Sequence, residues 1–150
     1  MIFEPKKITK PWGHEIWLAD GNRTPYATKI IFFKAGNRTS LQVHRCKFET
    51  TFVTKGTGKL LVSNAPFNTD EFLSIGMTHT EILQYEQNMK VIDLYPNLLF
   101  DIKPNYVHRI IAHTDLEFIE SSTVELDDVI RLQDDTGRGN GKILSEHLGY

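Results

Sequence analysis

The segment from Gly36 to Gly56 reads GNRTSLQVHRCKFETTFVTKG, and it places metal-ligand side chains in a stretch of strand-like composition. Gln42 and His44 are two residues apart. Side chains alternate faces along an extended chain, so these two can approach one ion from a single strand. Glu49 follows His44 at an odd offset and would face away on a straight strand. The spacing therefore predicts a metal site together with a local distortion of the strand.

The distortion is expected near Cys46 and Lys47, where a turn or bulge would redirect the side chain of Glu49. A second histidine has to complete the predicted site. The candidate is His108 in DIKPNYVHRI, because a proline and an asparagine mark a turn directly before it and an apolar run follows it.

Length and composition exclude several classes of protein. A chain of 150 residues corresponds to one domain with one core. The formal net charge of -2, with both signs scattered, provides no basic stripe for a nucleic acid. No signal peptide or membrane helix is recognisable, and the single cysteine agrees with a reducing compartment. We therefore expect a soluble, cytoplasmic protein that binds neither nucleic acid nor membrane.

Short runs rich in branched and aromatic residues, separated by turn residues, predict an all-β sandwich or barrel. Continuous apolar runs at 30–33 and 110–112 suggest strands that are covered on both faces by a partner sheet or subunit. The best helix signal is Thr80 to Asn88, and one helical turn is expected after Glu125. The runs read as strands are ATKIIFFKAG, FETTFVTKG, GKLLVS, MKVIDLY, NLLFDIKP, HRIIAH and LEFIESSTVE.

The glycine-bounded segment resembles the first motif of the cupin superfamily, with Gln42 at the position of the first histidine. DIKPNYVH resembles the second cupin motif, with Lys103 at the usual proline position and Asn105 at the glycine position, which asparagine tolerates. The resemblance implies the cupin double-stranded β-helix, or jelly roll, as a single domain over 1–150. We expect its core at about 10–138 and a flexible or dimer-contacting tail at 139–150.

Three further segments resemble type II mannose-6-phosphate isomerase: KPWGHEIW from Lys10, SLQVH from Ser40 and DDVIRLQDDTGR from Asp127. This family normally carries its cupin behind a guanylyltransferase, for which this chain has no room. The resemblance implies conversion of an aldose to a ketose through an enediol at a divalent metal. It implies zinc, manganese, cobalt, iron or nickel as cofactor, and the metal ligands Gln42, His44, Glu49 and His108.

Four basic residues are candidates for phosphate contact or catalysis: Lys47, Arg38, Arg131 and Lys10. Arg109 ranks below Lys47, Arg38 and Arg131 as a phosphate contact, because it follows a metal ligand and faces the opposite side of the strand. The expected ligand is a sugar phosphate or nucleotide sugar, and the expected assembly is a homodimer in which the amino-terminal KPWG strand or the tail is exchanged.

Two other functional classes stay open. Where the isomerase family reads QMHHHRAEHW, this chain reads QVHRCKFETTF. That difference is compatible with a non-catalytic sugar-binding cupin. The same ligand set could also hold iron in a dioxygenase or lyase.

Overall fold

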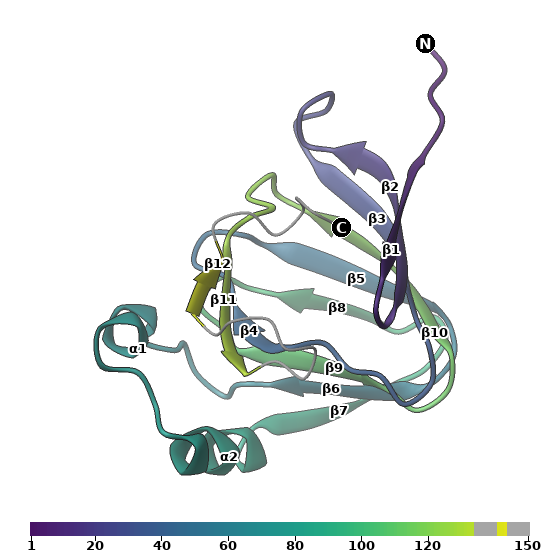
Figure 1. Cartoon of the computed structure of the whole chain (residues 1–150). Coiled ribbons are helices and arrows are strands. Elements are labelled where there is room, and N and C mark those ends of the chain that lie inside the picture. The colour runs from purple at the N-terminus through teal and green to yellow at the C-terminus, as the bar shows by residue number, and fades with distance from the viewer. Residues whose placement is uncertain (134–140, 144–150) are drawn as a thin grey trace.

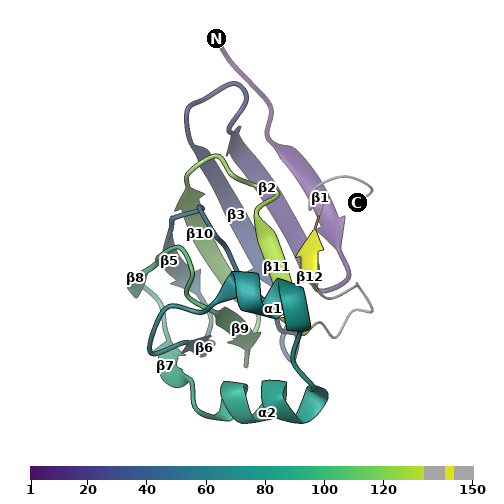
Figure 2. The same ribbon diagram turned by 90° about the vertical axis from the view of Figure 1, so that its left-hand side faces the viewer.

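The computed structural model describes residues 1–133 and 141–143, and within them two antiparallel sheets pack face to face (Figure 1). Two short helices lie together outside the strands (Figure 2). The elements are β1 Lys6–Lys10, β2 Gly13–Asp20, β3 Ala27–Phe33, β4 Leu41–Val43, β5 Glu49–Lys55, β6 Gly58–Val62, α1 Thr69–Ile75, α2 His79–Gln87, β7 Lys90–Leu94, β8 Leu99–Ile102, β9 His108–Ala112, β10 Leu116–Ser122, β11 Val129–Gln133 and β12 Gly141–Ile143.

Strands from distant parts of the chain alternate in both sheets. The first sheet has the order β1-β2-β3-β10-β5-β8, and the second has the order β12-β11-β4-β9-β6-β7. Neighbouring strands are antiparallel throughout. The architecture is an all-β jelly roll, as the sequence predicts.

The main core fills the space between the sheets. Trp12 stacks on Phe33 with ring centroids 3.9 Å apart, and Phe33 stacks on Phe118 at 6.1 Å. These rings meet buried aliphatic residues from both sheets, including Val53 and Leu60. Burying such side chains contributes about 1.5–3 kcal/mol each, and Trp12, Phe33 and Phe118 also line the cavity that holds the polar groups between the sheets.

A second apolar cluster lies between the second sheet and the two helices. It joins Leu41 and Val43 of β4 and Ile130 and Leu132 of β11 to Ile82 of α2. The helices therefore cover the outer face of the second sheet.

The helix predicted at Thr80 to Asn88 is confirmed as α2, which begins with a capping box between Thr78 and Glu81. The sequence reading missed α1, although Asn68 caps it and acidic residues fill its first turn. The helical turn predicted after Glu125 is wrong in its extent. The chain turns at 126–127 and then continues as β11, because the branched residues of VIRLQ pair with β4.

Of the predicted tail at 139–150, only 141–143 belong to the described residues, and they pair with β11 of the same chain. Residues 134–138 of the matched motif lie outside the described part. The KPWG segment links β1 to β2, which pair with each other in the same chain, so an exchanged strand stays a prediction. Among the described residues, no helix is long and apolar enough to span a membrane.

Candidate metal centre

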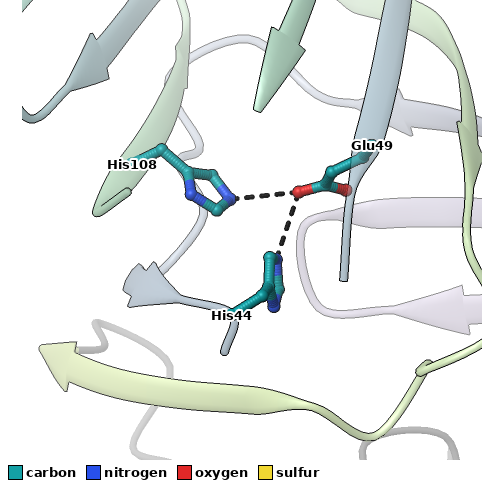
Figure 3. A group of neighbouring side chains, drawn as sticks. All are labelled: His44, Glu49 and His108. Atoms are coloured by element: carbon teal, nitrogen blue, oxygen red, sulfur yellow. Dashed lines mark hydrogen bonds and ion pairs between the residues drawn. The ribbon is translucent and has the colours of Figure 1, made fainter. Parts of the chain in front are cut away.

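Two histidines and one glutamate from three different strand ends meet inside the sandwich (Figure 3). His44 follows β4, Glu49 begins β5 and His108 begins β9. Glu49 Oε1 is 3.1 Å from His44 Nε2 and 3.3 Å from His108 Nε2. One ligand atom from each of the three buried residues lies within 4.8 Å of the other two. The prediction that these residues converge is confirmed.

Backbone carbonyls fix the outer ring nitrogens of both histidines. His44 Nδ1 lies 2.5 Å from the carbonyl oxygen of Asp128, and His108 Nδ1 lies 3.0 Å from that of Tyr106. A neutral imidazole that donates Nδ1–H to a carbonyl keeps the Nε2 lone pair for an ion. Burial lowers the pKa of His44, against the opposing effect of Glu49, and favours this neutral form. Both Nε2 atoms therefore point at the shared carboxylate as metal ligands would.

Asp128 shapes the bend that turns Glu49 toward the histidines. Its carboxylate accepts the backbone N–H groups of Arg45 at 3.1 Å, Cys46 at 2.6 Å and Lys47 at 3.0 Å. Burial by itself would raise the pKa of Asp128, but these donors outweigh it and hold the pKa below its ordinary value. The distortion predicted near Cys46 and Lys47 is confirmed, and its cause is a side chain more than eighty positions away.

We expect Asp128→Ala to loosen this bend. Loss of a charged acceptor from three N–H groups should lower the free energy of unfolding by about 1–3 kcal/mol and weaken metal binding about 10–100-fold. Urea denaturation and metal titration measure the two effects. Asp70→Ala is the matched control, because Asp70 also contacts this loop, at Arg45, but through an exposed ion pair. Equal effects of the two substitutions would contradict the role assigned to Asp128.

Gln42 lies beside the cluster of His44, Glu49 and His108 and pairs with His108 across β4 and β9. Its amide nitrogen is 3.5 Å from His108 Nε2, while its amide oxygen accepts a hydrogen bond of 2.6 Å from the hydroxyl of Ser40. A half-turn of the amide exchanges these two atoms and would present the oxygen to an ion. Its role as a fourth ligand stays a prediction.

Lys47 and Glu120 extend the cluster by an ion-pair chain. Lys47 Nζ is 3.3 Å from Glu49 Oε2 and 3.0 Å from Glu120 Oε1. Because one ammonium serves two buried carboxylates, a proton is favoured on one of them. Burial, and then the charge of Glu49, raise the pKa of Glu120 to about 7. Burial would likewise raise the pKa of Glu49, but Lys47 and then His44 hold it well below its ordinary value.

The cluster opens on a small cavity of about 90 Å³ between the sheets, lined by both polar and apolar side chains. Lys29 and Glu15 also line it and form an ion pair of 3.5 Å. Among the described residues a larger hollow of about 480 Å³ lies between α1 and α2, but it contains none of the cluster residues. We therefore place the chemistry in the small cavity.

The structure separates the four basic candidates. Lys47 lines the cavity beside Glu49, whereas Lys10, Arg38 and Arg131 are absent from its described lining. Arg131 pairs with Gln42 across β11 and β4 and is buried, and Lys10 is buried at the end of β1. A bridge joins Arg38 to Ile111. Substrate contact by these three stays a prediction.

Arg109 faces away from the cavity, as the sequence predicts. Its guanidinium donates to Glu86 on α2 at 3.0 Å and to the carbonyl oxygen of Thr39 at 3.0 Å.

Sequence reasoning missed Glu120 and Asp128. The sequence does contain a sign that Glu120 faces inward, because it continues the alternation of the buried residues Leu116 and Phe118 on β10. Asp128 had none, since its partners are backbone groups of a distant loop.

The donor set fits a divalent transition ion. Two imidazole nitrogens and one carboxylate oxygen already point at a common centre, and the outer ring nitrogens are held in place. Three protein donors leave further coordination positions for a substrate. The identity of the ion does not follow from the donors, so zinc, manganese, cobalt, iron and nickel all remain candidates.

Solved structures share this architecture. The capsular polysaccharide assembling protein CapF from Staphylococcus aureus matches with a TM-score of 0.60 at 17% identity, over 88% of this chain and 32% of that one. Oxalate decarboxylase from Bacillus subtilis matches with a TM-score of 0.63 at 12% identity, over 86% of this chain and 30% of that one. The fold is that of the cupins. This chain spans about a third of the length of these two proteins.

A protein named as a sugar phosphate isomerase, from Acidithiobacillus ferrooxidans, also shares the cupin fold. It matches with a TM-score of 0.51 at 14% identity, over 77% of this chain and 62% of that one. No family model matches the sequence, and no curated protein matches it. At these identities the likenesses establish the fold, and the function has to be argued from the site.

Proposed function

We propose that this chain is a metal-dependent cupin enzyme that interconverts the aldose and ketose forms of a sugar phosphate. One observation carries the proposal: the buried cluster of His44, Glu49 and His108 adjoins a second carboxylate, Glu120, that the cluster does not use. An aldose–ketose interconversion needs a metal and a separate group that moves a proton. The motifs that resemble type II mannose-6-phosphate isomerase support the same reaction.

In this proposal each residue of the cavity has one task. A divalent ion held by His44, Glu49 and His108 would polarise the two neighbouring substrate oxygens. Glu120 takes the proton from the carbon beside the carbonyl and returns it to the former carbonyl carbon, while the hydroxyl proton passes from one of the two substrate oxygens to the other, so that an enediol forms and collapses. Lys47 bridges the carboxylates of Glu49 and Glu120, with its Nζ 3.3 Å from the first and 3.0 Å from the second.

The size of the cavity limits how a substrate binds. A volume of about 90 Å³ is small beside the roughly 300–1,000 Å³ of ordinary ligand pockets. It accommodates the reacting carbons and their oxygens, and the phosphate would stay outside the cavity. This geometry favours a sugar phosphate over a nucleotide sugar, because the metal reaches only the end of the molecule that enters.

The test is the conversion of mannose 6-phosphate to fructose 6-phosphate by the protein loaded in turn with zinc, manganese, cobalt, iron and nickel. We expect turnover with at least one metal, and a fall in kcat of about 10²–10⁴-fold in Glu120→Gln with unchanged metal content. Glu117→Gln on the same strand is the control, because its neighbour Phe118 points into the core and Glu117 points outward. Stoichiometric metal without turnover of any sugar phosphate would refute the isomerase.

A lyase or dioxygenase acting on a small carboxylate is the second candidate. The small cavity favours it, because two buried lysines, Lys29 and Lys47, line a space that a molecule of a few heavy atoms would fill. Oxygen uptake or release of carbon dioxide from oxalate and similar acids by the iron or manganese form would identify this class. If the chain is instead an isomerase of sugar phosphates, neither oxygen uptake nor release of carbon dioxide should be observed.

A further inference from the structure

The outer face of the first sheet has an apolar row that crosses five strands. Ile16 on β2 pairs with Ile30 on β3, and Ile30 pairs with Ile119 on β10. Ile119 pairs with Phe52 on β5, and Phe52 pairs with Leu99 on the edge strand β8. Cross-strand partners stand side by side on one face of a sheet. The row is therefore continuous, and Phe52 and Leu99 are 36% and 62% exposed.

Hydroxyl groups and one carboxylate flank this row on one side. Thr28 and Ser121 join their hydroxyl groups at 3.2 Å, and Thr50 donates to Asp101 at 2.6 Å. On the other side the ring of His14 stacks on Phe32, with centroids 5.1 Å apart. The centre of this surface is apolar, and charged groups, Asp101 and Glu117, lie at its margins, an arrangement that is typical of a protein interface.

The two sheets differ in what covers them. The outer face of the second sheet packs its leucines and valines under α1 and α2, as at Leu41 and Val43. Both helices lie on that side of the molecule (Figures 1 and 2), and no described element packs on the outer face of the first sheet. The continuous apolar run at Ile30–Phe33 thus has a buried face toward the cavity and a half-buried face toward the outside.

We propose that two copies of this chain associate through the outer faces of their first sheets. The sheet has six strands, and its middle lies between β3 and β10. A two-fold axis in the interface, parallel to the strands, places β3 over β10, β2 over β5 and β1 over β8 of the second copy. Ile30 then faces Ile119, and Ile16 faces Phe52, within the roughly 30° at which aligned sheets pack.

The charges at the ends of the row select this axis. Lys7 of β1 pairs with Ile16 and so extends the row at one end, while Asp101 of β8 stands beside the row at the other end. The axis parallel to the strands brings Lys7 of each copy toward Asp101 of the other. An axis along the row would instead place each Lys7 over Lys7 of the other copy, where like charges repel. The two ends of the row carry opposite charges, so they complement each other when two copies of the chain pack about this axis.

Sedimentation velocity from nanomolar to high micromolar concentration tests the proposal. We expect the wild type to dimerise, and Phe52→Glu and Leu99→Glu each to raise the dimer dissociation constant by about 30-fold or more, as loss of an interface anchor does. Val91→Glu is the matched control: Val91 is an exposed apolar strand residue, 57% exposed, but it lies on β7 of the second sheet. Circular dichroism verifies that each variant is folded.

A charge exchange tests the orientation separately. Lys7→Glu should weaken the dimer, and the double variant Lys7→Glu with Asp101→Lys should restore it. A wild type that stays monomeric, or a dimer that Phe52→Glu and Leu99→Glu leave unchanged, would overturn the proposal. A dimer weakened by both glutamate variants but not restored by the charge exchange would overturn the axis. None of these readouts depends on enzymatic activity, so a failure of the proposed reaction would leave them interpretable.

Discussion

His108→Ala is expected to abolish stoichiometric binding of a divalent metal and, with it, any turnover. The substitution removes one of two imidazoles and leaves Glu49 Oε1 with the single imidazole neighbour His44, at 3.1 Å. Loss even of a residue that only orients a ligand costs about 10–100-fold in metal affinity, so loss of the ligand itself should cost about 100-fold or more. Elemental analysis of the purified protein and calorimetric titration of the metal-free protein measure this.

His113→Ala is the control, because His113 is exposed beyond the end of β9 and belongs to no ligand cluster of the described residues. It should bind metal as the wild type does. Equal metal content in wild type and His108→Ala would exclude the proposed centre. A wild type that binds no added metal would refute the proposed enzyme and favour the non-catalytic class of cupin.

The part of the site that follows from local spacing could be predicted from the sequence. Gln42 and His44 alternate with Val43, so their common face is fixed by the strand itself. His108 could be placed because Asn105 adopts a left-handed conformation, with φ of 68°, in the turn before β9. These relations span a few residues, and local stereochemistry decides them.

Relations between distant segments could not be predicted in the same way. The bend before Glu49 depends on Asp128, and Glu120 reaches Lys47 only because β10 inserts between β3 and β5. The alternation of β10 marked Glu120 as inward-facing, but no spacing says which strand lies beside it. The sequence thus indicated which side chains could be ligands, whereas the strand order determines which other polar groups surround them.

The strands, like the site residues, were predictable only in part from local sequence. Branched and aromatic runs predicted β3 and β5 to β10, and the spacing of Gln42 and His44 placed 42–44 in a strand. The runs did not include β1, β2, β11 or β12, and β11 lies in a segment for which a helical turn was expected. The residues of β11 are extended because they pair with β4 and lie under the helices, where Ile130 and Leu132 are fully buried. Tertiary packing therefore determined their conformation more than propensity did.

Lys47→Met is expected to give the largest loss of stability. Lys47 is buried and is the ammonium between Glu49 and Glu120, so its removal leaves two carboxylates without their shared cation. Breaking a buried ion pair by removing one partner costs about 3–5 kcal/mol. Urea denaturation of the metal-free protein at pH 8 measures this loss. Lys55→Met is the control, because Lys55 is an exposed lysine at the other end of β5.

The pH dependence of the metal-free protein identifies the responsible carboxylates. Glu120 has a folded-state pKa of about 7, above its ordinary value of 4.5, so the folded wild type binds its proton more tightly. Stability should therefore fall as the pH rises from about 4.5 through 7. Glu49 has a lowered pKa, so its contribution is present above 4.5 and is lost only at lower pH, as the pH falls through its folded-state value.

Without Lys47 both carboxylates lose their nearest positive charge, and the pKa of each should rise. The difference in unfolding free energy between wild type and Lys47→Met should consequently be larger at pH 8 than at pH 5, because at pH 5 protons replace the missing cation. Added divalent metal should recover part of the loss, since it neutralises Glu49 but leaves Glu120 uncompensated. A loss that is equal at both pH values and insensitive to metal would show that Lys47 acts through packing and not through its charge.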